Sequence, residues 1–251
     1  MLTTHRRRLI LDRLTRDGQI IAKTLSQELQ LSEDTIRRDL RDLAQEGLLQ
    51  RVHGGALPAS RAVVDLAGRQ TLATEEKVAL GRAAAQMIQP GQVVILDGGT
   101  TTVQAARHLP RDLRATIVTH SPTIAVELVD HPVVEVILLG GRLFKHSAVA
   151  VGAATIEAIS RIRADIYFMG VTGIHPVAGL STGDLEEAHV KRALSANAAE
   201  TIVLASAEKL NAASPFVIAP ITDVNEIVVQ RDTPHEATAG FERLGISITR
   251  V

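Results

Sequence analysis

The chain has 251 residues, of which 45% are apolar and 22% are charged, so it can bury a core for one large domain or two ordinary ones. No apolar run approaches the roughly 18 residues of a membrane helix, and no signal-peptide core follows the basic N-terminus. We therefore expect a cytoplasmic protein without a membrane partner. The absence of cysteine excludes disulfides, thiolate metal sites and a cysteine nucleophile, and the five aromatic residues argue against a stacking platform for single-stranded nucleic acid.

Charge differs only slightly between the two parts of the chain. The formal net charge is -1; residues 1–57 carry 10 Lys and Arg against 8 Asp and Glu, and the remainder carries 17 against 20. Net charge alone therefore does not indicate a nucleic-acid-binding protein, and the positions of the charges have to decide.

The first 57 residues predict helices with their own apolar set. Thr4 is the expected cap of a first helix that ends at Gly18, and a short strand should follow at residues 19–21. A second helix is expected from about Lys23 to Leu29.

The third predicted helix is the best marked of these elements. Ser32 is a suitable N-cap, Ile36, Leu40 and Leu43 form an inward stripe, and Gly47 ends the helix. Residues 48–52 and the glycines that follow predict two short strands or a bent ribbon.

Residues off the apolar stripe of the third helix suggest DNA recognition. In a helix-turn-helix the N-terminal half of this helix enters the major groove, where arginine binds guanine through two hydrogen bonds and a hydroxyl can bind several base edges. We expect base contacts from Thr35 and Arg38 and phosphate contacts from Ser32, Arg37 and Arg41. Arg51 and His53 on the ribbon would contact DNA from the wing, and Arg6, Arg7 and Arg8 of the first helix could reach the DNA backbone. The alternative is a solvated helix face, partly neutralised by Asp39 and Asp42.

The same residues resemble a known family. The motif consists of Leu31-Ser32, Thr35-Ile36-Arg37-Arg38-Asp39-Leu40, Gly47-Leu48 and Arg51-Val52-His53-Gly54-Gly55-Ala56. It resembles the DeoR family of bacterial transcription regulators across nearly the whole N-terminal part. The resemblance implies a winged helix-turn-helix that binds double-stranded operator DNA, usually as a repressor.

The remainder of the chain predicts a second domain of the α/β class. Residues 58–73 contain Pro, Ser and Gly without a strong period, so we predict a linker between a DNA-binding domain at 1–57 and a larger domain at 74–251. From residue 74 onward, helical patterns alternate with short β-branched runs, which predicts a mostly parallel sheet. The runs lie at 93–96, 116–119, 133–139, 166–171, 201–204 and 227–229.

Loops that follow these strands are candidate ligand sites, because ligands of open parallel sheets bind at the carboxyl ends of the strands. The most informative loop offers backbone N–H groups and three hydroxyls to an anion: Asp97, Gly98, Gly99, Thr100, Thr101 and Thr102. Two further loops and two lysines could converge on it: Thr119, His120 and Ser121; Gly140, Gly141 and Arg142; and Lys191 and Lys209.

Together these loops resemble the sensor domain of the same family, which is similar in fold to pentose-phosphate isomerases, sugar-phosphate deaminases and CoA-transferase-like proteins. The resemblance implies that the Asp97–Thr102 turn holds a phosphate, that residues 140–142 close over it, and that Glu187 and Lys191 address sugar hydroxyls or the phosphate. His120 departs from the family, which commonly has asparagine there. The stretch Ser206-Ala207-Glu208-Lys209 also departs, since an aspartate usually opens it; either change could alter which sugar fits.

Enzyme and metal sites are the competing interpretations. Gly179-Leu180-Ser181-Thr182-Gly183 matches a hydrolase elbow, but the preceding residues are a broken loop rather than an apolar strand. An isomerase or deaminase-like activity would need a carboxylate and a lysine at the reacting carbons, which Asp97, Glu187 and Lys191 could supply. The nine histidines are scattered, so we expect no metal and no cofactor.

The interpretation we favour is a homo-oligomeric DNA-binding repressor, dimeric or tetrameric, of carbohydrate-metabolism genes. A phosphorylated sugar or related metabolite would release it from operator DNA. We expect an oligomer because one three-helix module reads too few base pairs and paired half-sites require symmetry.

Overall fold

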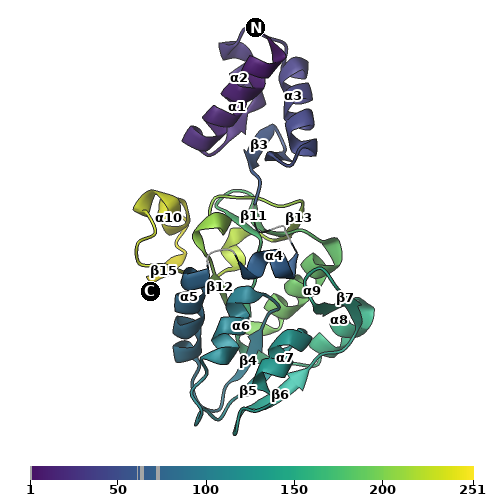
Figure 1. The fold of residues 1–251 in the computed structure, drawn as a ribbon, viewed down its shortest axis with the longest axis vertical. Helices are drawn as coiled ribbons and strands as arrows, with labels where there is room; N and C mark the ends of the chain where they lie inside the picture. Colours follow the sequence, from purple (N-terminus) through teal and green to yellow (C-terminus); the bar gives the residue numbers. More distant parts are fainter. Residues whose placement is uncertain (1, 61, 63–64, 72–73) are drawn as a thin grey trace.

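The computed structural model of the chain describes residues 2–60, 62, 65–71 and 74–251. Figure 1 shows a small N-terminal head and a larger body, and the chain passes from one to the other at the end of strand β3. The body is built around a single large sheet. Among the described residues, no helix has the combination of length and apolar character that crossing a membrane requires.

The head contains three helices and a three-stranded sheet of order β1-β3-β2. Its elements are α1 (Thr3–Asp17), β1 (Ile20–Ile21), α2 (Ala22–Glu28), α3 (Glu33–Gln45), β2 (Leu49–Val52) and β3 (Gly55–Pro58). Ile10, Leu25, Ile36 and Leu40 pack in its centre with at most 2% of each side chain exposed. The predicted order of three helices and a hairpin is confirmed.

The two predicted helix starts in the head have different outcomes. The Ser32 hydroxyl accepts a hydrogen bond from the Thr35 N–H at 3.2 Å, so Ser32 is the N-cap of α3 as predicted. The prediction that Thr4 caps the first helix is wrong, because α1 already begins at Thr3 and Leu2 precedes it without a side-chain cap. The first turn is exposed, so water can satisfy its N–H groups.

Gly55 is required where the wing closes on the helices. A Cβ atom at this position would lie 1.7 Å from the Ile20 carbonyl oxygen, across the β1–β3 pair. Only glycine allows the two backbones to approach this closely.

Ion pairs between α1 and α3 fix the head. The Arg6 guanidinium donates to both Asp39 oxygens, one of them at 3.0 Å, and both side chains are buried. Arg7 pairs with Asp42 and Glu46 in the same way. Asp39 and Asp42 therefore neutralise arginines of α1 rather than those on the outer face of α3.

The body contains a seven-stranded sheet of order β15-β14-β12-β9-β4-β5-β6, in which every neighbouring pair is parallel. The strands are β4 (Val93–Leu96), β5 (Thr116–Thr119), β6 (Glu135–Leu138), β9 (Ala164–Met169), β12 (Ala198–Leu204), β14 (Glu226–Val229) and β15 (Ser247–Arg250). The predicted parallel α/β class is confirmed, and β4 and β5 have the predicted bounds.

Helices cover both faces of this sheet. One face packs on α5 (Thr74–Met87), α6 (Thr100–Arg107) and α7 (Pro122–Leu128). The other packs on α8 (Ala153–Ile159), α9 (Leu185–Ala196) and α10 (His235–Glu242). Within β4, Val94 and Leu96 join the first core and Ile95 joins the second, as alternating side chains of a central strand must.

Two short antiparallel units and the last strand were not predicted. β7 (Arg142–Phe144) pairs with β8 (Val149–Val151), and β11 (Gly179–Thr182) lies between β10 (Gly173–His175) and β13 (Phe216–Ala219). These strands have three or four residues, too few to show a period in the sequence. Two 3-10 turns, Ala207–Lys209 and Ile221–Asp223, complete the body.

Ser181 of the hydrolase-like sequence lies on β11 and is 3% exposed. Its hydroxyl donates to the Gly173 carbonyl oxygen at 3.3 Å and accepts from the Ser214 N–H at 2.9 Å. A nucleophile elbow would instead present this oxygen at the top of a strand–helix turn. Ser181 therefore has a packing role.

The segment after β3 is attached to the body. Pro58 and Ser60 form backbone hydrogen bonds with Ala213, at 3.1 and 3.2 Å, and the Ser60 hydroxyl donates to the Thr172 carbonyl oxygen. Helix α4 (Leu66–Gln70) also falls within the predicted linker. Residues 61, 63–64 and 72–73 of that linker lie outside the described residues, and the boundaries 1–57, 58–73 and 74–251 stay predictions.

Replacing Asp39 with alanine should destabilise the head by about 3 kcal/mol, because Arg6 would keep a buried charge without its partner. Hydrogen exchange of α1 and α3 amides measures this directly. Asp12→Ala, an exposed acidic position on α1, is the control and should change the exchange free energies by less than about 0.5 kcal/mol. Equal protection in the Asp39 variant and the control would contradict the role of this ion pair.

Candidate functional site

The predicted DNA-contacting residues form one exposed surface on α3 and the wing. Ser32, Arg37, Arg38, Arg41, Arg51 and His53 are exposed and Thr35 is half-buried. Arg37 is paired with Glu33 at 2.7 Å and approaches Asp34 at 3.9 Å. Within the described part of the chain, no ion pair involves Arg38 or Arg41. These two guanidinium groups can therefore contact DNA without first breaking an ion pair.

Ser32 and Thr35 are already hydrogen-bonded to each other. Their hydroxyl oxygens are 2.8 Å apart, in addition to the N-cap bond. This contact orders the start of α3, the end that a major groove would receive.

A pocket lies in the body where the order of the sheet changes direction. After β4 the chain moves outward to β5 and β6, and then returns to β9 on the other side of β4. Parallel sheets bind ligands at such a switch point, beyond the carboxyl ends of the strands. The Asp97–Gly99 turn after β4 and the first turn of α6 lie there.

The pocket combines predicted and unpredicted residues. The predicted ones in its lining are Gly98, Gly99, Thr100, Thr101, Thr102, Glu187, Lys191 and Lys209. The others are Ala62, Lys77, Met169, Gly170, Val171, Thr172, Thr182, Leu204 and Glu208. The pocket measures about 30 Å³ and is partly open to solvent. Its inner part is of the order of a water molecule, so a larger ligand would extend toward the opening.

Three lysines and two glutamates line the pocket. Lys77, Lys191 and Lys209 come from α5, α9 and the turn after β12, and each has at most 7% of its surface exposed. The glutamates are Glu187, whose carboxylate is 3.4 Å from the Thr182 hydroxyl, and Glu208. The pocket therefore offers both ammonium and carboxylate groups to a ligand.

The first turn of α6 adds a hydroxyl suited to an anion. The Thr101 oxygen is buried and has no hydrogen-bond partner among the described residues. A buried hydroxyl without a partner is costly, and a ligand oxygen would satisfy it. Gly98 also has to be glycine, since a Cβ there would lie 2.1 Å from Val149 Cγ1.

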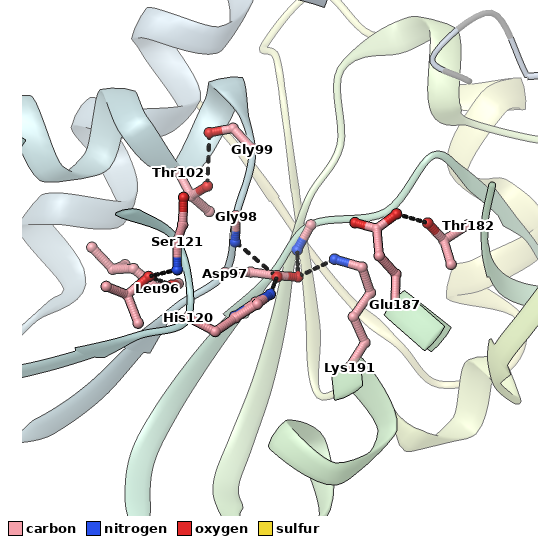
Figure 2. A network of polar contacts seen from close by, with 12 residues as sticks. Leu96, Asp97, Gly98, Gly99, Thr102, His120, Ser121, Thr182, Glu187 and Lys191 are labelled. Carbon is pink, nitrogen blue, oxygen red and sulfur yellow. Dashed lines mark hydrogen bonds and ion pairs between the residues drawn. The ribbon is translucent and has the colours of Figure 1, made fainter. Parts of the chain in front are cut away.

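Asp97 lies beneath the pocket rather than in its lining, and Figure 2 shows the groups that surround it. One carboxylate oxygen accepts hydrogen bonds from Lys191 Nζ at 2.6 Å, the Tyr167 hydroxyl at 2.8 Å and the Gly170 N–H at 2.7 Å. The other accepts from the Gly98 N–H at 2.8 Å. Asp97 therefore joins β4, β9 and α9 and orients Lys191.

Burial and charge act in opposite directions on this network. Burial favours the neutral form of Asp97, but the Lys191 charge and the hydrogen bonds outweigh it, so the pKa of Asp97 is lowered. Burial, followed by the Asp97 charge, raises the pKa of Tyr167 well above its usual value. The Asp97–Lys191 pair is thus charged, and Tyr167 is a neutral donor.

His120 is a buried neighbour of Asp97. Its Nε2 lies 3.4 Å from the second Asp97 oxygen, and its Nδ1 is buried without a hydrogen-bond partner among the described residues. Burial lowers the pKa of His120 to about 4, although the Asp97 charge opposes this shift. His120 is therefore uncharged at neutral pH, and Lys191 supplies the positive charge beside Asp97.

The lining of the pocket does not include the predicted residues Thr119, His120 and Ser121, which lie at the end of β5 behind it. Thr119 donates to the Leu96 carbonyl oxygen at 2.7 Å, and its hydroxyl accepts from the Ser121 N–H at 3.1 Å. These bonds tie the end of β5 to the end of β4.

The structure does not bring Gly140, Gly141 and Arg142 to the pocket. Gly140 accepts a hydrogen bond from the Thr155 hydroxyl at 2.8 Å, and a Cβ on Gly141 would lie 2.0 Å from that oxygen. Arg142 is exposed at the start of β7. Gly141 thus lets the turn pack on α8, and closure of residues 140–142 over a ligand stays a prediction.

Some unpredicted lining residues had a signal in the sequence. Residues 169–172 lie at the carboxyl end of the predicted strand 166–171, so this end could have been included among the candidate loops. Lys77 had no such signal, because a lysine within a polar helix usually faces solvent. No described group of histidine, aspartate and glutamate residues could hold a metal ion.

Acidification should destabilise the protein through His120. Between the ordinary pKa of 6.5 and the folded-state value of about 4, the unfolded chain binds a proton that the folded protein does not. This stability is present above pH 6.5 and is lost as pH falls toward 4, with a loss of about 2 kcal/mol between pH 7 and pH 5. Denaturant unfolding at several pH values should show a smaller loss for His120→Asn. If the free energy of unfolding depends on pH identically in the wild type and in His120→Asn, this role of His120 is contradicted.

Comparison with known protein families agrees with both halves of the structure. Residues 6–62 match the DeoR-like helix-turn-helix domain, and residues 72–231 match the DeoR C terminal sensor domain. The first match contains helix α3, and the second contains most of the residues that line the pocket.

Individual proteins are also similar over nearly the whole chain. HTH-type transcriptional regulator GlpR of Haloferax volcanii is 31% identical, covering 99% of this chain and 98% of the relative. The glycerol-3-phosphate regulon repressor of Escherichia coli is 30% identical, covering 93% of each. Ribose 5-phosphate isomerase A of Methanocaldococcus jannaschii matches 58% of this chain and 55% of its own, with 16% identity and a TM-score of 0.41. On the two domain matches and these full-length relatives, the chain belongs to the DeoR family of DNA-binding transcriptional regulators.

Proposed function

We propose that this regulator represses carbohydrate-metabolism genes and is released from operator DNA when a phosphorylated sugar or related metabolite binds the pocket beside Asp97. The observation that carries the proposal is the combination, within one chain, of free arginines on a recognition helix and a pocket lined by three buried lysines. The name of the Escherichia coli relative, a glycerol-3-phosphate regulon repressor, supports a phosphorylated ligand. A regulator that binds chromosomal operators would act in the cytoplasm.

On the DNA side, Arg38 and Thr35 read base edges while Arg37, Arg41 and Ser32 contact phosphates. Arg51 and His53 contact DNA from the wing. The exposure of these groups and the absence of described ion pairs at Arg38 and Arg41 support this division.

On the effector side, the phosphate lies at the first turn of α6, where Thr101 and the N–H groups of residues 99–102 face an anion. Helix N-termini favour negative charge, and the buried lysines add to this preference. Glu187 accepts hydrogen bonds from the hydroxyl groups of the ligand. Lys191 is held by Asp97 and contributes charge from below.

Ligand entry is coupled to the head through the wall of the pocket. The inner part of the pocket is small, about 30 Å³, so a sugar phosphate that enters it would displace residues of its wall. Thr172 is one of them, and its carbonyl oxygen accepts the hydrogen bond from Ser60, two residues beyond β3. A coupling free energy of about 1–3 kcal/mol would change operator affinity roughly 5- to 150-fold.

Binding without catalysis fits the Asp97 geometry better than an isomerase does. A general base needs an accessible carboxylate oxygen. Asp97 is 0% exposed and accepts four hydrogen bonds, so it acts on Lys191 and the loop rather than on a substrate. An assay of sugar-phosphate isomerisation by the purified protein should therefore give no turnover above background.

Replacing Arg38 with alanine should weaken specific operator binding about 5- to 150-fold for each head that contacts DNA, because a bidentate base contact is lost. Fluorescence anisotropy with labelled DNA from upstream of its own and neighbouring genes, at fixed salt, measures this change. Arg111→Ala removes the same charge from an exposed site of the body and is the control. Effector affinity should stay unchanged in both variants; unaltered operator binding by Arg38→Ala would exclude its base contact.

Replacing Thr101 with valine should weaken effector binding about 10-fold or more while leaving folding intact. The substitution keeps the side-chain shape and removes a hydroxyl that has no described partner, so only the bond to a charged ligand is lost. Calorimetric titration with a panel of sugar phosphates and their unphosphorylated forms measures the loss. Thr116→Val on β5 is the matched control. If Thr101→Val and Thr116→Val bind the effector with equal affinity, the phosphate does not contact the first turn of α6.

A further inference from the structure

The predicted linker contributes a residue to the wall of the pocket. Ala62 is 2% exposed and lies in the pocket lining, whereas every other lining residue that the structure describes belongs to residues 74–251. Figure 1 shows the chain passing from β3 in the head to α4 on the body, and Ala62 lies between these two elements. The segment that carries the head is therefore also part of the candidate effector site.

Ser60 holds Ala62 in this position. The Ser60 hydroxyl oxygen accepts a hydrogen bond from the Ala62 N–H at 3.1 Å and donates to the carbonyl oxygen of the lining residue Thr172. The backbone is held as well, because the Ser60 N–H donates to the Ala213 carbonyl oxygen at 3.2 Å and the Ala213 N–H donates to the Pro58 carbonyl oxygen at 3.1 Å. One buried side chain thus joins the linker, Ala62 and the pocket wall.

A second attachment lies at the start of α4. The Leu66 N–H donates to the His146 carbonyl oxygen at 2.9 Å, in the turn between β7 and β8. The same hairpin carries Val149, which lies so close to Gly98 of the lining that a Cβ there would be 2.1 Å from its Cγ1. The linker is thus attached both beside Thr172 and to the hairpin that packs on Gly98.

Ala62 is the lining residue whose displacement disturbs the core least. Its methyl group is buried, but it belongs to none of the three hydrophobic clusters formed by the described residues. Met169, Val171 and Leu204 of the lining belong to the two clusters of the body, where movement would open a costly cavity. A sugar phosphate that enters the inner part of the pocket therefore displaces Ala62 more readily than these residues.

We propose that the docked linker and the effector exclude each other from the pocket. A sugar phosphate bound at the first turn of α6 displaces Ala62, which breaks the hydrogen bonds of Ser60 with Ala62 and Thr172 and frees the segment that carries the head. The inference rests on the proposed function, because it assigns the operator response to this displacement. A head on a free segment loses more orientational freedom when it binds its operator site, so its affinity falls.

Mutual exclusion fixes the direction of each effect. Coupling between two binding events is reciprocal, so a change that weakens docking of the linker must strengthen effector binding, and bound effector must loosen the linker. A segment that only supports the pocket, or one that closes over its ligand, behaves in the opposite way. Weakening such a segment weakens effector binding, and the ligand orders it. The two arrangements therefore differ in sign rather than in size.

Hydrogen exchange of the full chain tests the displacement without DNA. The Ser60, Ala62 and Leu66 amides each donate a hydrogen bond in the docked linker. The probes are glycerol 3-phosphate, glucose 6-phosphate and fructose 1-phosphate, and calorimetry identifies which of them binds. A bound probe should raise the exchange rates of these three amides about 10-fold or more, while the amides of β14 keep their rates. Equal or slower exchange with a probe that binds would overturn the inference.

Replacing Ser60 with alanine should tighten binding of that probe about 5-fold and weaken operator binding by a similar factor, because the docked linker loses the hydroxyl that fixes Ala62. Ser195→Ala is the matched control. It removes another partly buried hydroxyl, 2.9 Å from the Thr201 hydroxyl toward the C-terminal end of α9, and should change neither affinity. Weaker probe binding by Ser60→Ala, or tighter probe binding with unchanged operator affinity, would contradict mutual exclusion.

These measurements separate the inference from the proposed function. Release of the wild type from operator DNA by a probe that leaves linker exchange unchanged would retain the proposed function and overturn only the exclusion. Failure of every probe to bind both the wild type and Ser60→Ala would contradict the proposed function itself, and the inference with it.

Discussion

The body of this regulator is organised around one buried carboxylate. Asp97 ends the central strand β4, and its two oxygens accept hydrogen bonds from β9, α9 and its own loop. A buried anion is tolerated only when charge and hydrogen bonds compensate it, and here Lys191 does so. The result is a fixed loop above β4, of which Gly98 to Thr102 line the pocket.

His120 is a buried member of the Asp97 network that carries no charge. Its imidazole lies beside Asp97 and is neutral at pH 7, so it adds no positive charge there. Its Nδ1 is buried without a described partner, so the site tolerates one unsatisfied atom below the pocket and another, Thr101 Oγ1, in its lining. Only the second lies in the pocket lining, where the proposed effector would meet it.

In the head, some arginines are held in ion pairs and others are not. Arg6 and Arg7 neutralise acidic residues on the inner side of α3, and Arg37 is held by Glu33. Among the described residues no ion pair holds Arg38 or Arg41, as the proposed DNA contacts require. The wing strand β3 leads within two residues to Ser60, which is hydrogen-bonded to Thr172 in the pocket lining, so the head is attached at the wall of the pocket.

The sequence by itself determined the order of elements in the head, the recognition helix and the central strands, because caps, apolar periodicity and β-branched runs are local signals. It also placed the glycine-threonine loop at the pocket, since a loop after a buried strand lies at the ligand-binding edge. Only the tertiary structure decided which distant residues complete the pocket. Lys77 of α5 lines the pocket, Asp97 lies beneath it, and Arg142 is exposed on β7. These outcomes depend on how helices and short antiparallel strands pack against the sheet, and no local pattern encodes the direction of a single side chain.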